Sequence, residues 1–158
     1  MSNTKQQVRA EEETVEQMGV FFEKAGFSPV QGRVFAYLLL AEPPQKSFYE
    51  IQEFLKASKS SISIALKNLT ERDMVEYITF SGDRKRYFKV DVEGWLGNTK
   101  EQVKGATVFN NLVKNVLIHR QNSNHPDFNA QLEKVTEFYE GLSKAMDKFI
   151  DKWEKENE

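Results

Sequence analysis

The chain of 158 residues is 39% hydrophobic and 29% charged, has a net charge of −2 and contains no cysteine. This composition suits one compact domain, or a small domain with long dimerising helices. It excludes a disordered acidic tail, disulfides, thiolate catalysis and cysteine-ligated zinc. The longest apolar run, 34–41, is too short to cross a bilayer, and the polar opening residues give no secretory signal, so we expect a cytoplasmic protein that meets no membrane.

The first part of the chain predicts two helices. Apolar residues recur three and four positions apart over 8–26, and Gly26 is a typical residue at a helix end. Ser28 suits the cap of a second helix, with Pro29 in its first turn. That helix should end before the two prolines at 43–44, because proline cannot continue it.

Two more helices are predicted before the middle of the chain. Ser47 suits the cap of a short third helix, and a break at 57–58 precedes a fourth helix over 59–72. The inner face of the third helix carries Ile51, Phe54 and Leu55. The buried stripe of the fourth consists of Ile62, Ala65, Leu66 and Leu69.

A β-hairpin is predicted next. The segment 75–80 is rich in β-branched and aromatic residues, the turn at 81–83 contains Gly82, and 87–90 returns as a second strand. Its tip then spans 81–86. Two short strands are marginal alone, so we expect the helices to support them.

The last third predicts two long helices. The first runs over about 93–121, the segment 122–126 breaks it, and the second follows. Apolar and aromatic residues recur along the second helix at spacings of three and four, namely Leu132, Val135, Tyr139, Leu142, Met146, Phe149 and Trp153. This seam could pack on its own domain or on a second copy of the chain. Because a small domain offers too little surface to cover it, we predict a homodimer.

The charge is distributed unevenly. Residues 56–89 hold 8 basic and 4 acidic residues, whereas the segments on both sides carry a net negative charge. A basic centre between acidic flanks is typical of a local anion-binding face. An ordinary solvated surface is the alternative explanation.

The order of these elements is typical of a winged helix-turn-helix, because two helices at a tight turn are followed by a hairpin with a cationic tip. We therefore predict a mainly α fold with a small β-hairpin wing and long dimerisation helices. Opposite its buried stripe, the fourth helix carries Ser60, Ser63, Ile64 and Lys67. Small polar side chains, a cation and an apolar tip suit the base edges of a major groove in double-stranded DNA.

Two clusters suit phosphate. Ser58, Lys59 and Ser61 surround the start of the fourth helix, where free amides favour anions, although such serines can also be caps or solvent-facing residues. At the tip of the hairpin, three consecutive cations suit phosphates and a narrow minor groove, although a charged tip can also protect a sheet edge. These cations are Arg84, Lys85 and Arg86.

The sequence resembles the GbsR-like branch of the MarR superfamily of bacterial transcriptional regulators between Gly26 and Trp95. The matching positions are Gly26-Phe27-Ser28-Pro29, Gly32-Arg33-Val34, Leu38-Leu39-Leu40, Ser58-Lys59, Ser63, Gly82, Arg84, Arg86-Tyr87-Phe88 and Trp95. The resemblance implies a winged domain at 27–92, helical dimerisation regions at 1–26 and 93–158, and a pseudo-palindromic operator. By position, it also assigns Ser58, Lys59, Ser60, Ser61, Ser63 and Lys67 to the recognition helix and Arg84 and Arg86 to the wing, with Arg33 as a further phosphate contact.

Relatives of this kind often respond to a small molecule, which makes a small-molecule effector a candidate partner. An aromatic cage for a quaternary ammonium is chemically feasible. Its candidate residues are Phe21, Phe22, Tyr37, Trp95 and Phe109. Aromatic residues at helical spacing more commonly belong to a core, and that alternative stays open.

No catalytic site or metal site is predicted. His119 and His125 lack the converging ligands that zinc needs, and His119 suits the dipole at a helix end. The chain has no nucleophile elbow or phosphate-binding glycine loop, so we do not expect an enzyme. We predict a homodimeric, sequence-specific DNA-binding regulator, acting as a repressor. The alternative is a winged-helix dimer that binds another protein.

Overall fold

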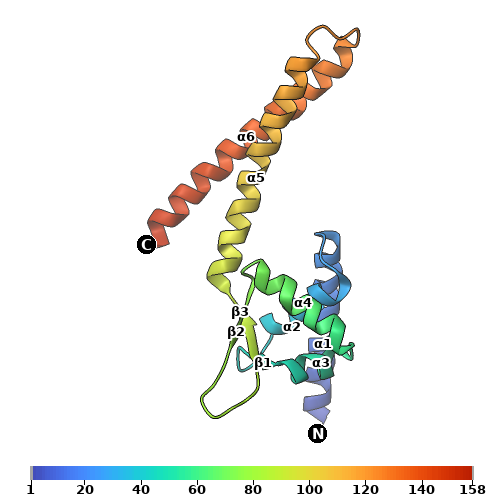
Figure 1. Ribbon diagram of the computed structural model, residues 1–158, viewed down its shortest axis with the longest axis vertical. Coiled ribbons are helices and arrows are strands. Elements are labelled where there is room, and N and C mark those ends of the chain that lie inside the picture. The colour runs from blue at the N-terminus through green and yellow to red at the C-terminus, as the bar shows by residue number, and fades with distance from the viewer. Residues whose placement is uncertain (1, 158) are drawn as a thin grey trace. The chain divides into compact units, whose positions relative to one another are not determined.

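The computed structural model describes residues 2–157, and their side chains from Gln6 onward (Figure 1). The chain forms two compact units, residues 1–98 and 99–158, which are described separately below. No helix among the described residues is both long enough and apolar enough to cross a bilayer.

The first unit opens with helices α1 (Ser2–Lys24) and α2 (Pro29–Leu39). Gly26 ends α1 in the left-handed conformation (φ 90°), and the amide of Phe27 donates to the carbonyl of Phe22, as in a Schellman cap. Ser28 caps α2 by accepting a hydrogen bond from the amide of Gln31. The predictions of Gly26 as a stop and Ser28 as a cap are confirmed.

Glycines let α1 and α2 approach closely. A Cβ atom on Gly32 would lie 2.9 Å from Phe22 Cβ and 3.2 Å from the carbonyl oxygen of Gly19. A Cβ atom on Gly19 would lie 2.7 Å from Arg33 Cγ. The helix α1 therefore packs on α2 as part of the winged unit, and its assignment to a dimerisation region stays a prediction.

Helices α3 (Phe48–Leu55) and α4 (Lys59–Glu71) follow. Ser47 and Glu50 form a capping box at the start of α3, and Ser58 caps α4 through the amide of Ser61. The predicted bounds of α4 are confirmed to within one residue. Its predicted buried stripe is also confirmed, namely Ile62, Ala65, Leu66 and Leu69.

The sheet has three strands, one more than the sequence predicted. Strands β2 (Val75–Ile78) and β3 (Tyr87–Val90) form the hairpin, and β1 (Lys46–Ser47) pairs with β3 on its other edge. All pairing is antiparallel, with Tyr77 opposite Phe88 and Ser47 opposite Tyr87. The predicted first strand ends two residues early, at Ile78, because Phe80 leaves the ladder and packs edge-on against Tyr87.

The core of the first unit joins all its helices to the hairpin. Its largest fully buried side chains are Phe35, Ile51, Ile62, Leu69, Val34 and Val75. Burying a side chain of this size contributes about 1.5–3 kcal/mol. This core fixes α4 relative to the hairpin, which is the relationship on which the candidate site depends.

Helix α5 (Val92–His119) begins in the first unit and continues into the second. Asp91 accepts a hydrogen bond from the amide of Gly94, and Trp95 packs edge-on against Phe35. A Cβ atom on Gly94 would lie only 2.0 Å from the carbonyl oxygen of Asp73. Only glycine, which has no Cβ atom, therefore allows the first turn of α5 to lie this close to the backbone of Asp73.

In the second unit, the later part of α5 pairs with α6 (Pro126–Asn157) as an antiparallel hairpin (Figure 1). Thr107 donates to Ser143 (2.9 Å), and Lys114 forms an ion pair with Glu140. Asn110, Thr136 and Ser143 are the buried polar residues here, so the contact between the two helices is substantially polar. The predicted class, mainly α with a small β-hairpin wing, is confirmed.

Candidate nucleic-acid interface

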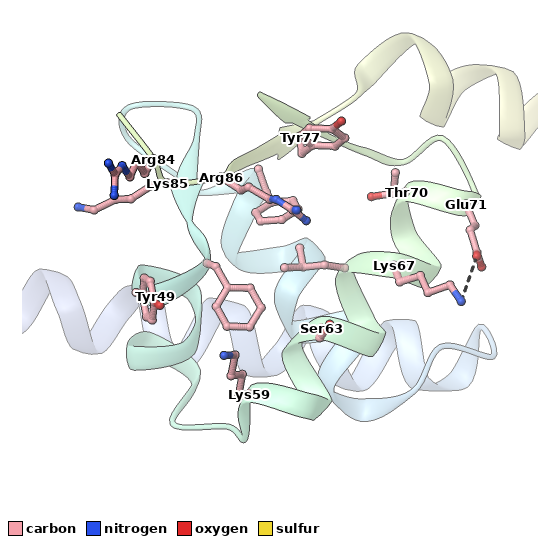
Figure 2. Close-up of a pocket in the computed structure, with 13 residues that line it drawn as sticks. Tyr49, Lys59, Ser63, Lys67, Thr70, Glu71, Tyr77, Arg84, Lys85 and Arg86 are labelled. Atoms are coloured by element: carbon pink, nitrogen blue, oxygen red, sulfur yellow. Dashed lines mark ion pairs between the residues drawn. The ribbon is translucent and has the colours of Figure 1, made fainter. Parts of the chain in front are cut away.

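A groove of about 710 Å³ separates α4 from the hairpin of β2 and β3, which we call the wing (Figure 2). Three elements build it: α4 forms one wall, the wing forms the other, and the start of α3 closes one end. It is lined by Phe48, Tyr49, Lys59, Ser63, Leu66, Lys67, Thr70, Glu71, Tyr77, Arg84, Lys85, Arg86 and Phe88. The structure thus brings predicted residues of the recognition helix and of the hairpin tip to one surface.

The groove is strongly cationic. Its lining contains five cations, Lys59, Lys67, Arg84, Lys85 and Arg86, against the single acid Glu71. Glu71 lies 3.6 Å from Lys67 in an exposed i,i+4 pair, which contributes little to stability. Lys67 is therefore free to exchange this partner for another anion, which makes the groove suited to a polyanion.

The wing tip presents its cations because its only acid is used inside the turn. Asp83 accepts hydrogen bonds from the amide of Lys85 (2.9 Å) and the hydroxyl of Tyr87 (2.8 Å). These bonds, first that of the Lys85 amide, lower the pKa of the Asp83 carboxyl. Gly82 supplies the left-handed backbone that the turn needs (φ 83°). Among the described residues, neither Arg84, Lys85 nor Arg86 forms an ion pair.

The short strand β1 holds the wing against α3. The amide of Phe48 donates to the carbonyl oxygen of Arg86 (3.3 Å), directly beside the pairing of Ser47 with Tyr87. Figure 2 shows the Arg86 side chain reaching over the groove, with Arg84 and Lys85 nearer the tip. The two-residue strand β1, which the sequence did not predict, therefore positions the base of the cationic tip.

The serines at the start of α4 divide into two groups. The hydroxyls of Ser60 and Ser61 lie 3.1 and 2.7 Å from Ser58 Oγ, so they form a local cluster around the cap. Ser63 is exposed one turn further along and lines the groove, and Ile64 is 60% exposed. The sequence predicted Ser60 and Ser63 on the base-reading face, whereas the structure places the Ser60 hydroxyl in the cap cluster and leaves Ser63, Ile64 and Lys67 exposed along α4.

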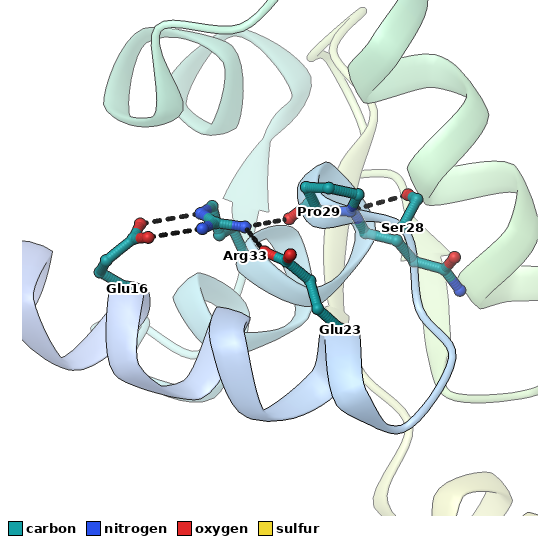
Figure 3. A network of polar contacts seen from close by, with 6 residues as sticks. Glu16, Glu23, Ser28, Pro29 and Arg33 are labelled. Carbon is teal, nitrogen blue, oxygen red and sulfur yellow. Dashed lines mark hydrogen bonds and ion pairs between the residues drawn. The ribbon is translucent and has the colours of Figure 1, made fainter.

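The side chain of Arg33, which was predicted to contact phosphate, is bound to partners inside the first unit (Figure 3). Its guanidinium binds both carboxylate oxygens of Glu16, at 2.5 and 2.8 Å, and one of Glu23 at 2.6 Å. It also donates to the carbonyl of Pro29 (2.8 Å). The bonds to Glu16, then Glu23, raise the pKa of Arg33, and the bond to Arg33 lowers the pKa of Glu16. Four of its five N–H donors are bound inside the protein, so Arg33 ties α1 to α2.

The predicted aromatic cage is not assembled by the first unit. Phe22 and Trp95 both pack edge-on against Phe35 in the core, and Tyr37 stacks on Phe54 with ring centroids 4.1 Å apart. Phe21 is 66% exposed. Phe109 belongs to the second unit, where it contacts Tyr139. The alternative explanation, packing, accounts for Phe22, Tyr37 and Trp95.

The predicted seam of α6 divides between two directions in the second unit. Tyr139 packs against Phe109 of α5, and Trp153 lies under the ammonium group of Lys100, at 5.1 Å. Leu132 and Met146 are partly buried like these two, whereas Val135, Leu142 and Phe149 are exposed. The exposed face continues with Phe138 on α6 and with Val108, Leu112 and Val116 on α5. Four of the seven seam residues are thus partly buried, two of them in contact with α5, and the other three are exposed.

Among the groove residues that the sequence did not predict are two exposed tyrosines. Tyr49 and Tyr77 are 65% and 59% exposed and face the groove from α3 and β2 (Figure 2). Tyr49 lies off the apolar stripe of its helix, which is a signal that the sequence contains. Tyr77 had no such signal, because β-rich segments carry aromatic residues on either face.

Comparison with known proteins supports this architecture. The crystal structure of a transcriptional regulator matches with a TM-score of 0.70 and 22% identity, over 92% of this chain and 99% of that chain. The chain has the fold of a winged-helix transcriptional regulator. A crystal structure of apo MarR from E. coli matches this winged-helix chain with a TM-score of 0.42 and 15% identity, over 73% of this chain and 83% of that chain.

A curated relative of this winged-helix chain is the HTH-type transcriptional regulator MmpR5 of Mycobacterium tuberculosis, which is 29% identical over 100 residues. The match covers 63% of this chain, and the chain spans 61% of the length of that relative. No protein-family model matches the chain.

Proposed function

We propose that this winged-helix protein is a sequence-specific DNA-binding regulator of transcription. The observation that carries the proposal is the groove, because α4 and the wing tip supply five cations to one surface with a single acid. Nucleic-acid affinity depends mainly on such cations, which bind phosphates and release counterions. The relatives described above are transcriptional regulators, which supports the same assignment.

In this proposal α4 is the recognition helix and reads base edges in the major groove. Ser63 offers a hydroxyl donor and acceptor, Lys67 offers a cation for guanine or phosphate, and Ile64 offers an apolar contact for a thymine methyl group. Lys59 and the cap at Ser58 suit phosphate at the amino end of the helix. The wing cations Arg84, Lys85 and Arg86 contact phosphates and the adjacent minor groove.

We further propose that the regulator acts as a homodimer through the second unit. In this proposal a second copy covers the exposed residues of the α6 seam and the exposed apolar residues of α5. A symmetric dimer would bind a pseudo-palindromic operator whose half-sites lie about 34 Å apart, one turn of duplex. Repression then follows if the operator overlaps a promoter, because the bound dimer blocks polymerase.

Two finer assignments complete the proposal. From the resemblance between Gly26 and Trp95, we propose that the chain belongs to the GbsR-like branch of the MarR superfamily. We also propose that a small molecule releases it from DNA by changing the spacing of the recognition helices. A ligand screen tests the second assignment by measuring operator affinity. If no compound alters that affinity, the effector hypothesis is wrong, whereas the DNA-binding proposal stands.

The test of the DNA-binding proposal is fluorescence anisotropy with the DNA upstream of the protein's own gene and with scrambled DNA of equal length, across a salt series. We expect selective binding, with log K falling steeply in log salt at about 0.9 per phosphate neutralised. Absence of binding to either DNA at low salt would overturn the proposal. It would favour the alternative, a winged-helix dimer that binds another protein.

A further inference from the structure

The two exposed tyrosines of the groove have hydroxyl groups without a partner among the described residues, although the ring of Tyr49 packs edge-on against Phe48. Tyr49 and Tyr77 are 65% and 59% exposed, and neither hydroxyl makes a hydrogen bond among the described residues. By contrast, the hydroxyl of Tyr87 is bound to Asp83, and Tyr37 is stacked on Phe54. A large exposed aromatic residue with a free polar tip is typical of an interface.

The fold holds both tyrosines at fixed places around the cations. Tyr49 follows Phe48, whose amide is bound to the carbonyl of Arg86, so the start of α3 is tied to the base of the wing tip. Tyr77 lies directly opposite Phe88 in the sheet, and both residues line the groove. The tyrosines thus stand on two different elements on either side of Arg86 (Figure 2).

The groove combines these donors with an apolar floor. Phe48, Leu66 and Phe88 line its inner surface, while the cations lie at its rim. A phenolic hydroxyl donates well to a phosphate oxygen, and an aromatic ring packs against a deoxyribose without reading its base. Together, an apolar floor, neutral donors and a cationic rim match the alternating sugars and phosphates of one DNA strand.

We propose that one strand of the bound DNA runs along this groove and that Tyr49 and Tyr77 donate hydrogen bonds to its phosphates. This inference rests on the proposed function and adds two phosphate-binding residues that lie outside the recognition helix and the cationic tip. The two tyrosines fix the register of the strand between α4 and the wing and carry no sequence information.

The test compares Tyr49→Phe, Tyr77→Phe and the double variant with the wild type by fluorescence anisotropy, on operator and scrambled DNA across a salt series. Each substitution removes one oxygen and leaves the ring. Because the hydroxyls have no partner in the protein, we expect unchanged thermal unfolding. Tyr37→Phe is the matched control, since it is the same chemical change outside the groove.

We expect each tyrosine variant to bind both DNAs about three- to tenfold more weakly, with the same ratio of specific to non-specific affinity. The salt slope should stay that of the wild type, because a neutral donor releases no counterion. The double variant Arg84→Ala with Arg86→Ala is the comparator, and it should lower the slope by about 2.

Three results would overturn the inference. If both tyrosine variants bound DNA with wild-type affinity, no phosphate would contact the two hydroxyls, and the proposed function would still stand. A change in sequence preference would place the tyrosines against bases instead. A wild-type protein that binds no DNA would remove the proposed function itself and this inference with it.

Discussion

Arg33 of α2 and Glu16 of α1 form a two-pronged ion pair, in which Nη2 lies 2.5 Å from one carboxylate oxygen and Nε lies 2.8 Å from the other. The Arg33 side chain is 23% exposed, and its stem lies where Gly19 leaves room. Because both ends of the contact belong to helices of one unit, the pair fixes how α1 lies on α2.

Replacing Arg33 with alanine should therefore cost stability and leave DNA binding intact. We expect a loss of about 1–2 kcal/mol from the three hydrogen bonds to the carboxylates of Glu16 and Glu23 and from packing of the stem over Gly19. Thermal unfolding measures the loss, and anisotropy on the operator measures binding at a temperature where the variant is folded. Arg9→Ala is a control, since Arg9 makes only an exposed i,i+4 pair with Glu13. A weakened salt slope in Arg33→Ala would restore the original prediction of phosphate contact.

Acid should destabilise the start of α3. The hydroxyl and amide of Ser47 both donate to Glu50, which lowers the pKa of its carboxyl below the ordinary value of 4.5. The folded state therefore binds fewer protons than the unfolded state. The contribution of the Glu50 carboxylate to stability is present above pH 4.5, and it is lost as the pH falls through the lowered pKa of Glu50.

The variant Glu50→Gln tests this pH dependence. Its free energy of unfolding should be lower than that of the wild type at neutral pH, and the difference should shrink as the pH falls below 4.5. Denaturant unfolding at a series of pH values gives the two curves. Glu53→Gln on the same exposed side of α3 is the control, because the Glu53 side chain makes no hydrogen bond or ion pair among the described residues. A constant difference across the pH range would contradict the argument.

Sequence preference should depend on the middle of α4 and not on its cap. Lys67→Ala and Ser63→Ala should each cost about 1–3 kcal/mol on the operator and relax the preference at one base pair. Ser60→Ala is the matched control, because the Ser60 hydroxyl lies against Ser58 Oγ. Binding to a library of operator variants measures the preference. If Ser60→Ala weakened binding and relaxed the preference as much as Ser63→Ala, Ser60 would contact bases as the sequence predicted.

The outer face of α6 should carry dimerisation. Leu142 is 40% exposed on the face left uncovered by α5, so Leu142→Lys should give monomers that lose operator affinity and keep their helicity. Sedimentation measures the mass and circular dichroism the helicity. Glu133→Lys is the control, since Glu133 is exposed on the opposite side of α6 at 100° per residue. A dimeric Leu142→Lys would remove this face from the interface.

Local chemistry made much of the winged unit predictable. Three serines act as helix caps because their hydroxyls accept hydrogen bonds from nearby amides, namely Ser28, Ser47 and Ser58. Each of these bonds joins residues three positions apart in the sequence, so a short stretch of sequence predicts it. Gly26 and Gly82 mark left-handed turns because glycine has no Cβ atom. These signals span a few residues, so the order of helices and hairpin followed from the sequence.

Contacts between distant residues were harder to predict. Arg33 meets Glu16 seventeen positions earlier, and nothing around Arg33 indicates that its charge is used there. The strand β1 has two residues, too few for any alternating pattern, and exists because Lys46 and Ser47 lie beside β3. The packing of the aromatic candidates is likewise a contact between distant residues, because Phe22 and Trp95 both pack against Phe35.

Ser47 belongs to two elements at once, since its backbone pairs with Tyr87 of the wing while its side chain caps α3. Opening either contact weakens the other, because one residue must keep the geometry that both require. The root of the wing and the first turn of α3 should therefore open as one cooperative unit. Their amide protons would then exchange with solvent at a common rate, slower than those of the freely projecting tip.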